Sequence, residues 1–275
     1  MDGNRAALKT GAGAAVLCLA LAMTLIAWGA EPGKGLRAFP ELQLVWSGKT
    51  DRGVQIFFSR YAKKGWVNPV RLSDADEMVF LPGVASGTDN RIWAAWSRLD
   101  TRKKTAYLEY AMYDGSSWRQ PERIRTGLKD CRAVTVMVDR DNIPWLAWEG
   151  IEKKYTDIFV SRWSDGKWSP ARRVHVPNAV PDIEPALSLD AFGRLVLAWR
   201  TFSDGRYVET AKRWDGVRWQ PAAFSPEEDV VRQTLGSKME LPPLPAGLAA
   251  EPHRVGIFMK GARGAASLPL ARIYQ

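Results

Sequence analysis

The sequence is poor in the residues that build most metal, redox and disulfide-stabilised sites. It has two cysteines and two histidines among 275 residues, and Cys18 lies in an apolar N-terminal run. The remaining Cys131 cannot form an intrachain disulfide by itself, so we expect a fold held by its core and a buried, inert thiol. His175 and His253 lie far apart, without cysteines or carboxylates at the spacing typical of zinc sites. The sequence therefore predicts no metal and no cofactor.

Long apolar runs are absent except near the N-terminus. There, two basic residues precede an uncharged stretch at residues 10–30, which contains AAVLCLALAMTLIAW and small residues near its end. This order is typical of a signal peptide, and a run of roughly 20 residues is also long enough for a membrane anchor. We expect residues 1–30 to be one or the other. Residues 31–275 are then a single extracytoplasmic domain, periplasmic, secreted or held at the membrane by residues 10–30.

Acidic residues are outnumbered, and the formal net charge is +9. Such a surface is either simply solvated or suited to acidic partners. An exported protein has little access to nucleic acid, so we expect no nucleic-acid partner.

Tryptophan, by contrast, is abundant, with 13 residues, and most of them recur at a fixed interval. One series ends the short apolar runs LQLVW, IWAAW, PWLAW and LVLAW, about 51 residues apart: Trp46, Trp96, Trp148 and Trp199. The second series follows at a similar interval: Trp66, Trp118, Trp168 and Trp219. Five residues before each of these stands another aromatic: Tyr61, Tyr113, Trp163 and Trp214. A repeat of about 40–50 residues is typical of propeller blades.

Each repeat has the pattern of four short strands. In the fourth copy these are PALSLD, RLVLAW, RYVETAKRW and WQPAAF, separated by turn and loop residues that include Asp190–Gly193 and Asp215-Gly216. Short runs rich in β-branched and aromatic residues between such turns form hairpins. The second strand is apolar at nearly every position, which fits a sheet covered on both faces. The sequence thus predicts an all-β fold, a β-propeller of four-stranded antiparallel blades.

The chain ends indicate the number of blades. Residues 254–260, RVGIFMK, look like another second strand with Phe258 in the tryptophan position, and Tyr274 matches the aromatic that ends each third strand. Residues 35–40, GLRAFP, look like a fourth strand. We expect about five blades, closed by the N-terminal strand, which removes the free sheet edges. The repeats then lie near 41–90, 91–142, 143–193, 194–250 and 251–275.

The turns between third and fourth strands resemble those of sialidase-like propellers with Asp-box (bacterial neuraminidase) repeats. The matching segments are DGSSW, DGKW and DGVRW, while the first repeat reads AKKGW and has no aspartate. They are one or two residues shorter than the family motif Ser-x-Asp-x-Gly-x-x-Trp. They are also similar to turns of propeller lectins that bind fucosylated glycans. The resemblance implies that these turns lie away from the active face.

We interpret the turn residues as structural. An aspartate accepts hydrogen bonds from backbone amides two residues on, glycine takes a positive φ, and the tryptophan packs on the preceding aromatic. The residues in question are Asp114, Asp165, Asp215, Trp118, Trp168 and Trp219.

The loops after the second strands are the predicted ligand-binding face. They contain ten lysines and arginines against five acidic residues. Arg98, Glu149, Tyr155 and Arg200 are the candidates on this face. For a sialidase, the resemblance implies Arg37, Arg98 and Arg200 on a substrate carboxylate and Glu149 with Tyr155 as the nucleophile pair. No aspartate matches the acid/base, so no catalytic residue is assigned.

Three functions stay open at this point. The residues favour a non-catalytic extracytoplasmic binding propeller, acting as a monomer, that recognises a glycan or an envelope protein partner, anionic ligands included. The alternatives are a sialidase-type glycoside hydrolase and a membrane-anchored assembly or scaffold factor.

Overall fold

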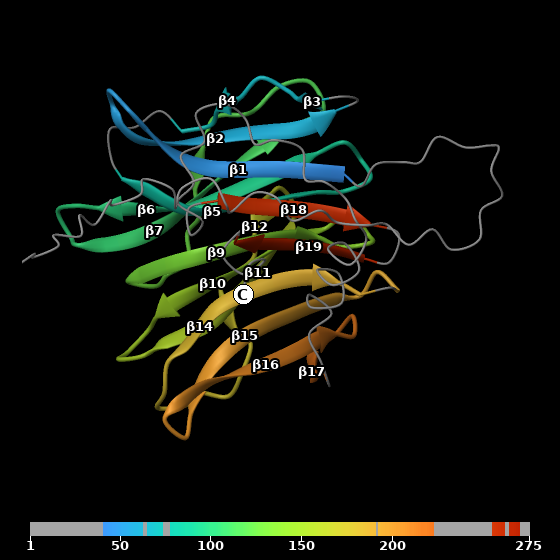
Figure 1. Ribbon diagram of the computed structural model, residues 1–275. Helices are drawn as coiled ribbons and strands as arrows, with labels where there is room; N and C mark the ends of the chain where they lie inside the picture. The colour runs from blue at the N-terminus through green and yellow to red at the C-terminus, as the bar shows by residue number, and fades with distance from the viewer. Residues whose placement is uncertain are drawn as a thin grey trace, which may run out of the picture.

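The computed structural model describes residues 41–62, 65–73, 78–190, 192–222, 255–261 and 264–269. Its regular secondary structure is entirely β (Figure 1). Within these ranges there is no helix that could cross a bilayer. The predictions for residues 1–30, for GLRAFP and for Tyr274 lie outside the described residues.

Four antiparallel units, here called blades 1 to 4, follow each other along the chain. Blade 1 contains β1 (Glu41–Thr50), β2 (Gly53–Ala62), β3 (Gly65–Trp66) and β4 (Val70–Arg71). Blade 2 contains β5 (Val79–Ser86), β6 (Ile92–Asp100), β7 (Thr105–Tyr113) and β8 (Glu122–Arg123). The predicted meander of short antiparallel strands is confirmed in both.

Blades 3 and 4 repeat the arrangement. Blade 3 contains β9 (Asp130–Val138), β10 (Pro144–Ile151), β11 (Thr156–Ser164), β12 (Lys167–Trp168) and β13 (Arg172–Arg173). Blade 4 contains β14 (Asp182–Leu189), β15 (Leu195–Ser203), β16 (Arg206–Trp214) and β17 (Trp219–Pro221). The strands of blade 4 overlap the four predicted segments, but β14 begins earlier, at Asp182, and β15 continues to Ser203, into residues predicted as a loop.

A final hairpin departs from the predicted arrangement. It consists of β18 (Val255–Gly261) and β19 (Gly264–Pro269), and it pairs with β1 on one side and β14 on the other. Blades 4 and 1 therefore form one continuous sheet, with the red hairpin in its middle (Figure 1). In the described residues Phe258 pairs with Gln43, so β18 occupies the first-strand position of blade 1 and is not the second strand of a separate blade. Covering the inner edge of β1 accounts for this placement.

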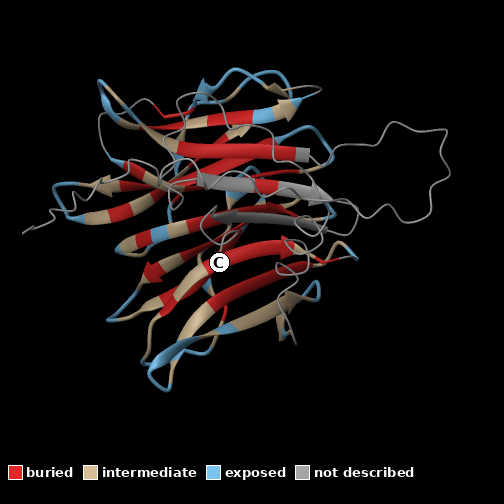
Figure 2. Cartoon of the chain, viewed as in Figure 1, coloured by how far each residue is buried: buried red, intermediate tan, exposed pale blue. Residues whose placement is uncertain are grey.

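The core follows the second strands, as the tryptophan series predicts. Trp96, Trp148 and Trp199 are at most 1% exposed and Trp46 is 7% exposed. Figure 2 shows burial concentrated along the inner strands, with exposure at the turns. Cys131 is buried beside Thr126, and burial raises the pKa of its thiol, so the predicted buried thiol is confirmed.

The first strands of blades 2 to 4 share a β-bulge opposite the second-strand tryptophan. One residue of each bulge has a positive φ: Leu81 at 48°, Ala133 at 49° and Glu184 at 54°. Such conformations cost on the order of 1–3 kcal/mol in non-glycine residues and persist only where the surroundings impose them. Because the bulge and its positive-φ residue occur in three successive blades, we interpret them as a regular feature of the blade structure. The pairing of β18 with β1 has no such shift.

The three aspartates in the turns between third and fourth strands act in two different ways. Asp114 accepts hydrogen bonds from the amides of Ser116 and Ser117, and Asp215 accepts the corresponding pair from its own turn. These bonds hold the pKa of Asp114 well below its usual range and lower that of Asp215 to about 2. Asp165 instead has φ 53°, followed by Gly166 at 74°. A two-residue turn of this type needs residues that tolerate positive φ, which is the contribution of Asp165.

Candidate functional site

The boundaries between blades are packed with aromatic rings. The tryptophan of each turn contacts the aromatic five residues earlier, as predicted, with ring centroids 5.2–5.8 Å apart. In blades 2 to 4 this tryptophan also reaches the preceding blade, which the sequence did not predict. Trp118 of blade 2 meets Phe58 of blade 1 edge-on at 5.0 Å.

The boundary between blades 2 and 3 is filled by four large rings. Trp93, which is 3% exposed, contacts Trp163 at 5.0 Å and Trp168 at 5.7 Å. Tyr110 contacts the same two tryptophans. Trp145 takes the place of Trp93 at the boundary of blades 3 and 4, where it packs on the two tryptophans of blade 4.

The boundary between blades 1 and 2 has smaller residues at matching positions. The residue three before the second-strand tryptophan is Gln43, where the next two repeats have Trp93 and Trp145. The Gln43 amide is buried and donates a hydrogen bond to Ser86 Oγ of β5, at 2.9 Å. Gln43 therefore puts a small buried amide where the next two repeats have a buried indole.

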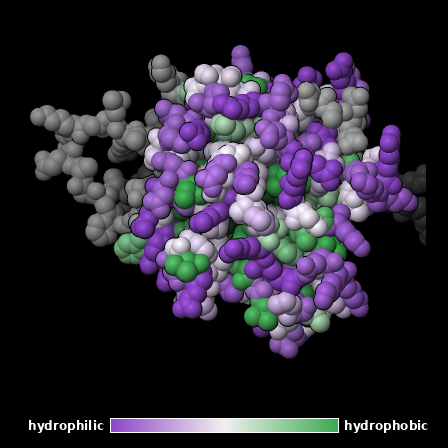
Figure 3. Space-filling view, turned by 180° about the vertical axis from the view of Figure 1, so that it is seen from behind, coloured by the Kyte–Doolittle hydropathy of each residue, from purple (hydrophilic) through white to green (hydrophobic). Residues whose placement is uncertain are grey.

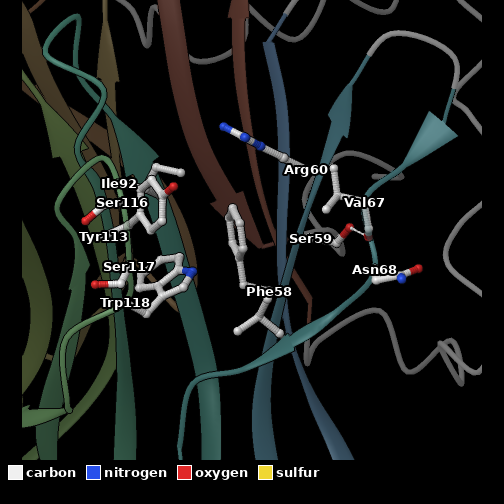
Figure 4. A pocket seen from close by; sticks show the side chains of 11 residues that line it. Phe58, Ser59, Arg60, Val67, Asn68, Ile92, Tyr113, Ser116, Ser117 and Trp118 are labelled. Carbon is white, nitrogen blue, oxygen red and sulfur yellow. Dashed lines mark hydrogen bonds between the residues drawn. The ribbon is translucent and has the colours of Figure 1, made fainter.

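A pocket of about 260 Å³ opens at this boundary (Figure 4). Blade 2 contributes one wall, in which Tyr113 and Trp118 are the large rings. Blade 1 contributes the opposite wall, and the Phe58 ring projects between the two (Figure 4). The complete described lining is Phe58, Ser59, Arg60, Val67, Asn68, Val70, Ile92, Tyr113, Ser116, Ser117 and Trp118.

The polar groups of the pocket are held by short-range hydrogen bonds. Ser59 Oγ donates to the carbonyl of Val67 at 2.5 Å, which fixes the β2–β3 side. On the other side, Asp114 holds the turn that carries Ser116 and Ser117. An aromatic floor with a few oriented polar groups at the rim is the usual composition of a small-ligand site.

The structure separates the four residues predicted for the ligand face. Arg98 is 3% exposed and forms an ion pair of 2.7 Å with Glu109, which also accepts a hydrogen bond from Trp96. Its guanidinium is thus covered, which does not favour its predicted contact with a ligand. Tyr155 lies in the β10–β11 connection, with the Lys154 ammonium 4.9 Å from its ring centre.

Glu149 and Arg200 do lie in one cluster, between blades 3 and 4. Glu149 accepts a hydrogen bond of 2.8 Å from the backbone amide of Glu184, and the Glu184 carboxylate is 3.3 Å from Arg200. Burial raises the pKa of Glu149. The cluster sits at the blade 4 bulge, where Glu184 has its positive φ.

The pocket residues were not predicted, because the predicted ligand-binding face was formed by the loops after the second strands. The sequence does mark this boundary, because Gln43 is a polar residue in a position that holds tryptophan in the next two copies. The face seen in Figure 3 is mainly hydrophilic, with small, scattered hydrophobic areas. It offers no large apolar surface that competes with the pocket as a binding site.

No protein-family model and no curated protein matches the sequence. Among solved structures, the chain resembles a protein of unknown function from Dyadobacter fermentans, with 13% identity, a TM-score of 0.46 and coverage of 68% of this chain and 70% of the other. It also resembles an endo-arabinase from Bacteroides thetaiotaomicron, with 11% identity, a TM-score of 0.46 and coverage of 82% and 89%. A fucose lectin from Kordia zhangzhouensis has 18% identity, a TM-score of 0.33 and coverage of 52% and 99%. Likenesses of this size say nothing of what this chain binds.

Proposed function

We propose that this protein is a non-catalytic binding propeller that recognises an acidic glycan in the pocket between blades 1 and 2. It would act outside the cytoplasm, as a monomer, with residues 1–30 as its signal peptide or anchor. The observation that carries the proposal is the pocket itself, which pairs aromatic rings with hydroxyl, amide and guanidinium groups.

The composition of the pocket suits a sugar. The rings of Phe58, Tyr113 and Trp118 can pack on the apolar C–H faces of a pyranose, while Asn68 and Ser117 can bond its hydroxyls. Pockets for drug-sized ligands measure about 300–1,000 Å³, so 260 Å³ is the right scale for one sugar unit of a longer chain.

The absence of carboxylates distinguishes binding from hydrolysis. Glycoside hydrolases generally need two carboxyl groups at the scissile bond. No aspartate or glutamate stands among the described lining residues, whereas Arg60 does. A guanidinium that no acid of the described lining faces favours a ligand with its own carboxylate or sulfate, such as a sialic or uronic acid.

The proposal is tested by binding to a glycan array that includes sialylated, uronic-acid and neutral sugars. We expect signals confined to acidic glycans and an affinity loss of about tenfold or more in Arg60→Ala, because a charge-assisted hydrogen bond contributes roughly 1.5–3 kcal/mol. Arg162→Ala is the matched control, since Arg162 occupies the equivalent exposed position of blade 3. Equal loss in both variants, or an array without signals, would count against a glycan site here.

A second candidate function is a sialidase-type glycoside hydrolase. It is favoured by the cluster of Glu149, Glu184 and Arg200, in which a glutamate with a raised pKa lies beside a second glutamate and an arginine. A fluorogenic sialoside assay tests it. Turnover abolished in both Glu149→Ala and Arg200→Ala would replace the binding proposal with catalysis at the boundary of blades 3 and 4.

A further inference from the structure

Three potential metal ligands from separate segments meet where blade 3 adjoins blade 4. Asp157 lies on β11, His175 follows β13, and Asp182 begins β14. One ligand atom from each lies within 4.8 Å of the others. The His175 Nε2 atom is 3.5 Å from Asp182 Oδ2 and 3.7 Å from Asp157 Oδ1.

The hydrogen bonds of His175 place its proton on Nδ1, so that Nε2, the ring atom nearest the two carboxylates, carries none. Its Nδ1 lies 3.0 Å from the carbonyl oxygen of Val176, an acceptor that requires the proton on Nδ1. Its Nε2 accepts a long hydrogen bond of 3.3 Å from the amide of Ile158. A ligating histidine typically donates its other ring N–H to a carbonyl in this way, which fixes the tautomer.

The two carboxylates are buried, and one has an oxygen without a hydrogen-bond partner. Asp157 is 7% exposed, and while its Oδ2 pairs with Arg173 at 3.1 Å, its Oδ1 has no partner. Asp182 is 1% exposed, and its Oδ1 accepts hydrogen bonds from Trp199 and Thr201. Leaving a buried carboxylate oxygen unpaired is costly, so a cation beside Asp157 Oδ1 would stabilise the group.

Blade 1 shows that the fold does not require these charged residues. There the positions equivalent to Asp157 and His175 are Gln55 and Ser73, both buried. Ser73 Oγ accepts the amide hydrogen of Ile56 at 2.8 Å and lies 3.0 Å from Gln55 Oε1. In blade 1 the equivalent backbone amide is thus satisfied by a neutral pair, so Asp157 and His175 of blade 3 call for another explanation.

We propose that Asp157, His175 and Asp182 bind one divalent transition-metal ion of the zinc type. Zinc bonds of about 2.0–2.1 Å in a tetrahedral site put neighbouring ligand atoms about 3.4 Å apart. The 3.5 and 3.7 Å distances from Nε2 need only a small closure, in which Nε2 exchanges its bond to Ile158 for the metal, while the two carboxylate oxygens, within 4.8 Å of each other, move together by a larger amount. One imidazole and two carboxylates suit zinc better than calcium, which prefers six to eight oxygen ligands.

The surrounding charges agree with a bound cation. Asp157, Asp182 and Glu152 bring three negative charges, against Arg173 and Lys212, whose ammonium donates to the Val174 carbonyl. The neighbourhood thus has one negative charge in excess. A metal here joins two blades and the connection between them, so its main effect is to stabilise this boundary.

The test is a titration of the chelator-treated full chain, kept in mild detergent, with zinc chloride. Calorimetry is expected to show one site per chain and thermal unfolding a raised midpoint. The paired change Asp157→Gln with His175→Ser, which copies the residues of blade 1, should keep the circular dichroism of the fold and weaken zinc binding about tenfold or more. His253→Ala removes the only other histidine and should bind like the wild type.

Zinc affinity that is equal in the wild type and the blade 1 copy would overturn the proposal, as would a wild type without a zinc site. If the copy does not fold, X-ray absorption of zinc in the His253→Ala chain decides. One imidazole nitrogen in the shell, necessarily from His175, supports the site, and a shell without imidazole refutes it. The result does not depend on glycan binding, because the pocket lies at another boundary.

Discussion

Two neighbouring boundaries differ in what lies between the blades. The boundary of blades 2 and 3 is filled with aromatic rings, whereas the boundary of blades 1 and 2 has a pocket. Between blades 2 and 3, Trp93, Tyr110, Trp163 and Trp168 fill the space with mutual ring contacts. Between blades 1 and 2, Gln43 stands in the position of the indole, and a pocket lined by Phe58, Tyr113, Trp118 and their neighbours opens at the same boundary. Of the three boundaries between the described blades, the one that lacks this indole is the one with the pocket.

Trp93→Gln tests the packed boundary and should have the largest effect. The substitution removes a buried indole and leaves an amide among the three remaining rings, so we expect a loss of about 3–5 kcal/mol in the free energy of unfolding. Urea denaturation followed by tryptophan fluorescence measures it. A loss below about 1 kcal/mol would mean that the rings at this boundary are loosely packed and that the contrast with the pocket is not real.

Gln43→Trp is the converse change and should have an intermediate effect. We expect the larger indole at position 43 to occupy the boundary between blades 1 and 2, close the pocket and abolish glycan binding. Loss of the hydrogen bond to Ser86 and local overpacking should cost about 1–3 kcal/mol of stability. Denaturation and glycan binding are measured on the same preparation. Retained binding would show that the ligand does not use the boundary region around residue 43.

Acid should loosen the pocket wall slightly while leaving the packed boundary unchanged. The amides of Ser117 and Ser116 lower the pKa of Asp114, so its stabilising contribution is present above the unfolded value of about 3.9 and is lost as the pH falls through the lower folded value. Asp114→Asn should therefore lower the urea midpoint near pH 6, with a difference from the wild type that shrinks below pH 4.

The matched control is Asp165→Asn in the turn at the packed boundary. Asparagine tolerates the positive φ of that position, so the midpoint should not change at either pH. A difference between wild type and Asp114→Asn that stays constant down to pH 2 would exclude the charge of Asp114 as its cause.

Much of the scaffold could be predicted because it is local and repeated. Strand order within a blade, the burial of Trp96 and the contact of Trp163 with Trp168 depend on residues close in sequence. The conformation of Asp165 was not predicted because the same Asp-Gly pair serves two turn types. One turn uses the side chain of the aspartate as an acceptor, and the other uses its tolerance of positive φ.

The candidate sites could not be predicted because each joins residues that only the packing of blades brings together. Phe58 and Trp118 face each other across a boundary, and Asp157, His175 and Asp182 come from three segments. Spacing along the chain gave no sign of a metal site, since none of these ligands lies within four residues of another. The pairing of β18 was equally hidden, because its sequence resembles a second strand.

The position of the β18–β19 hairpin has a consequence for the order of events during synthesis. Blade 1 is the first described blade to be translated, yet its innermost strand is residues 255–261. Blades 2, 3 and 4 have all their strands as soon as each has been made, whereas β1 keeps a free edge until residues 255–261 have been made. A chain cut short before residue 255 should therefore retain three complete blades and expose β1 to pairing with other chains.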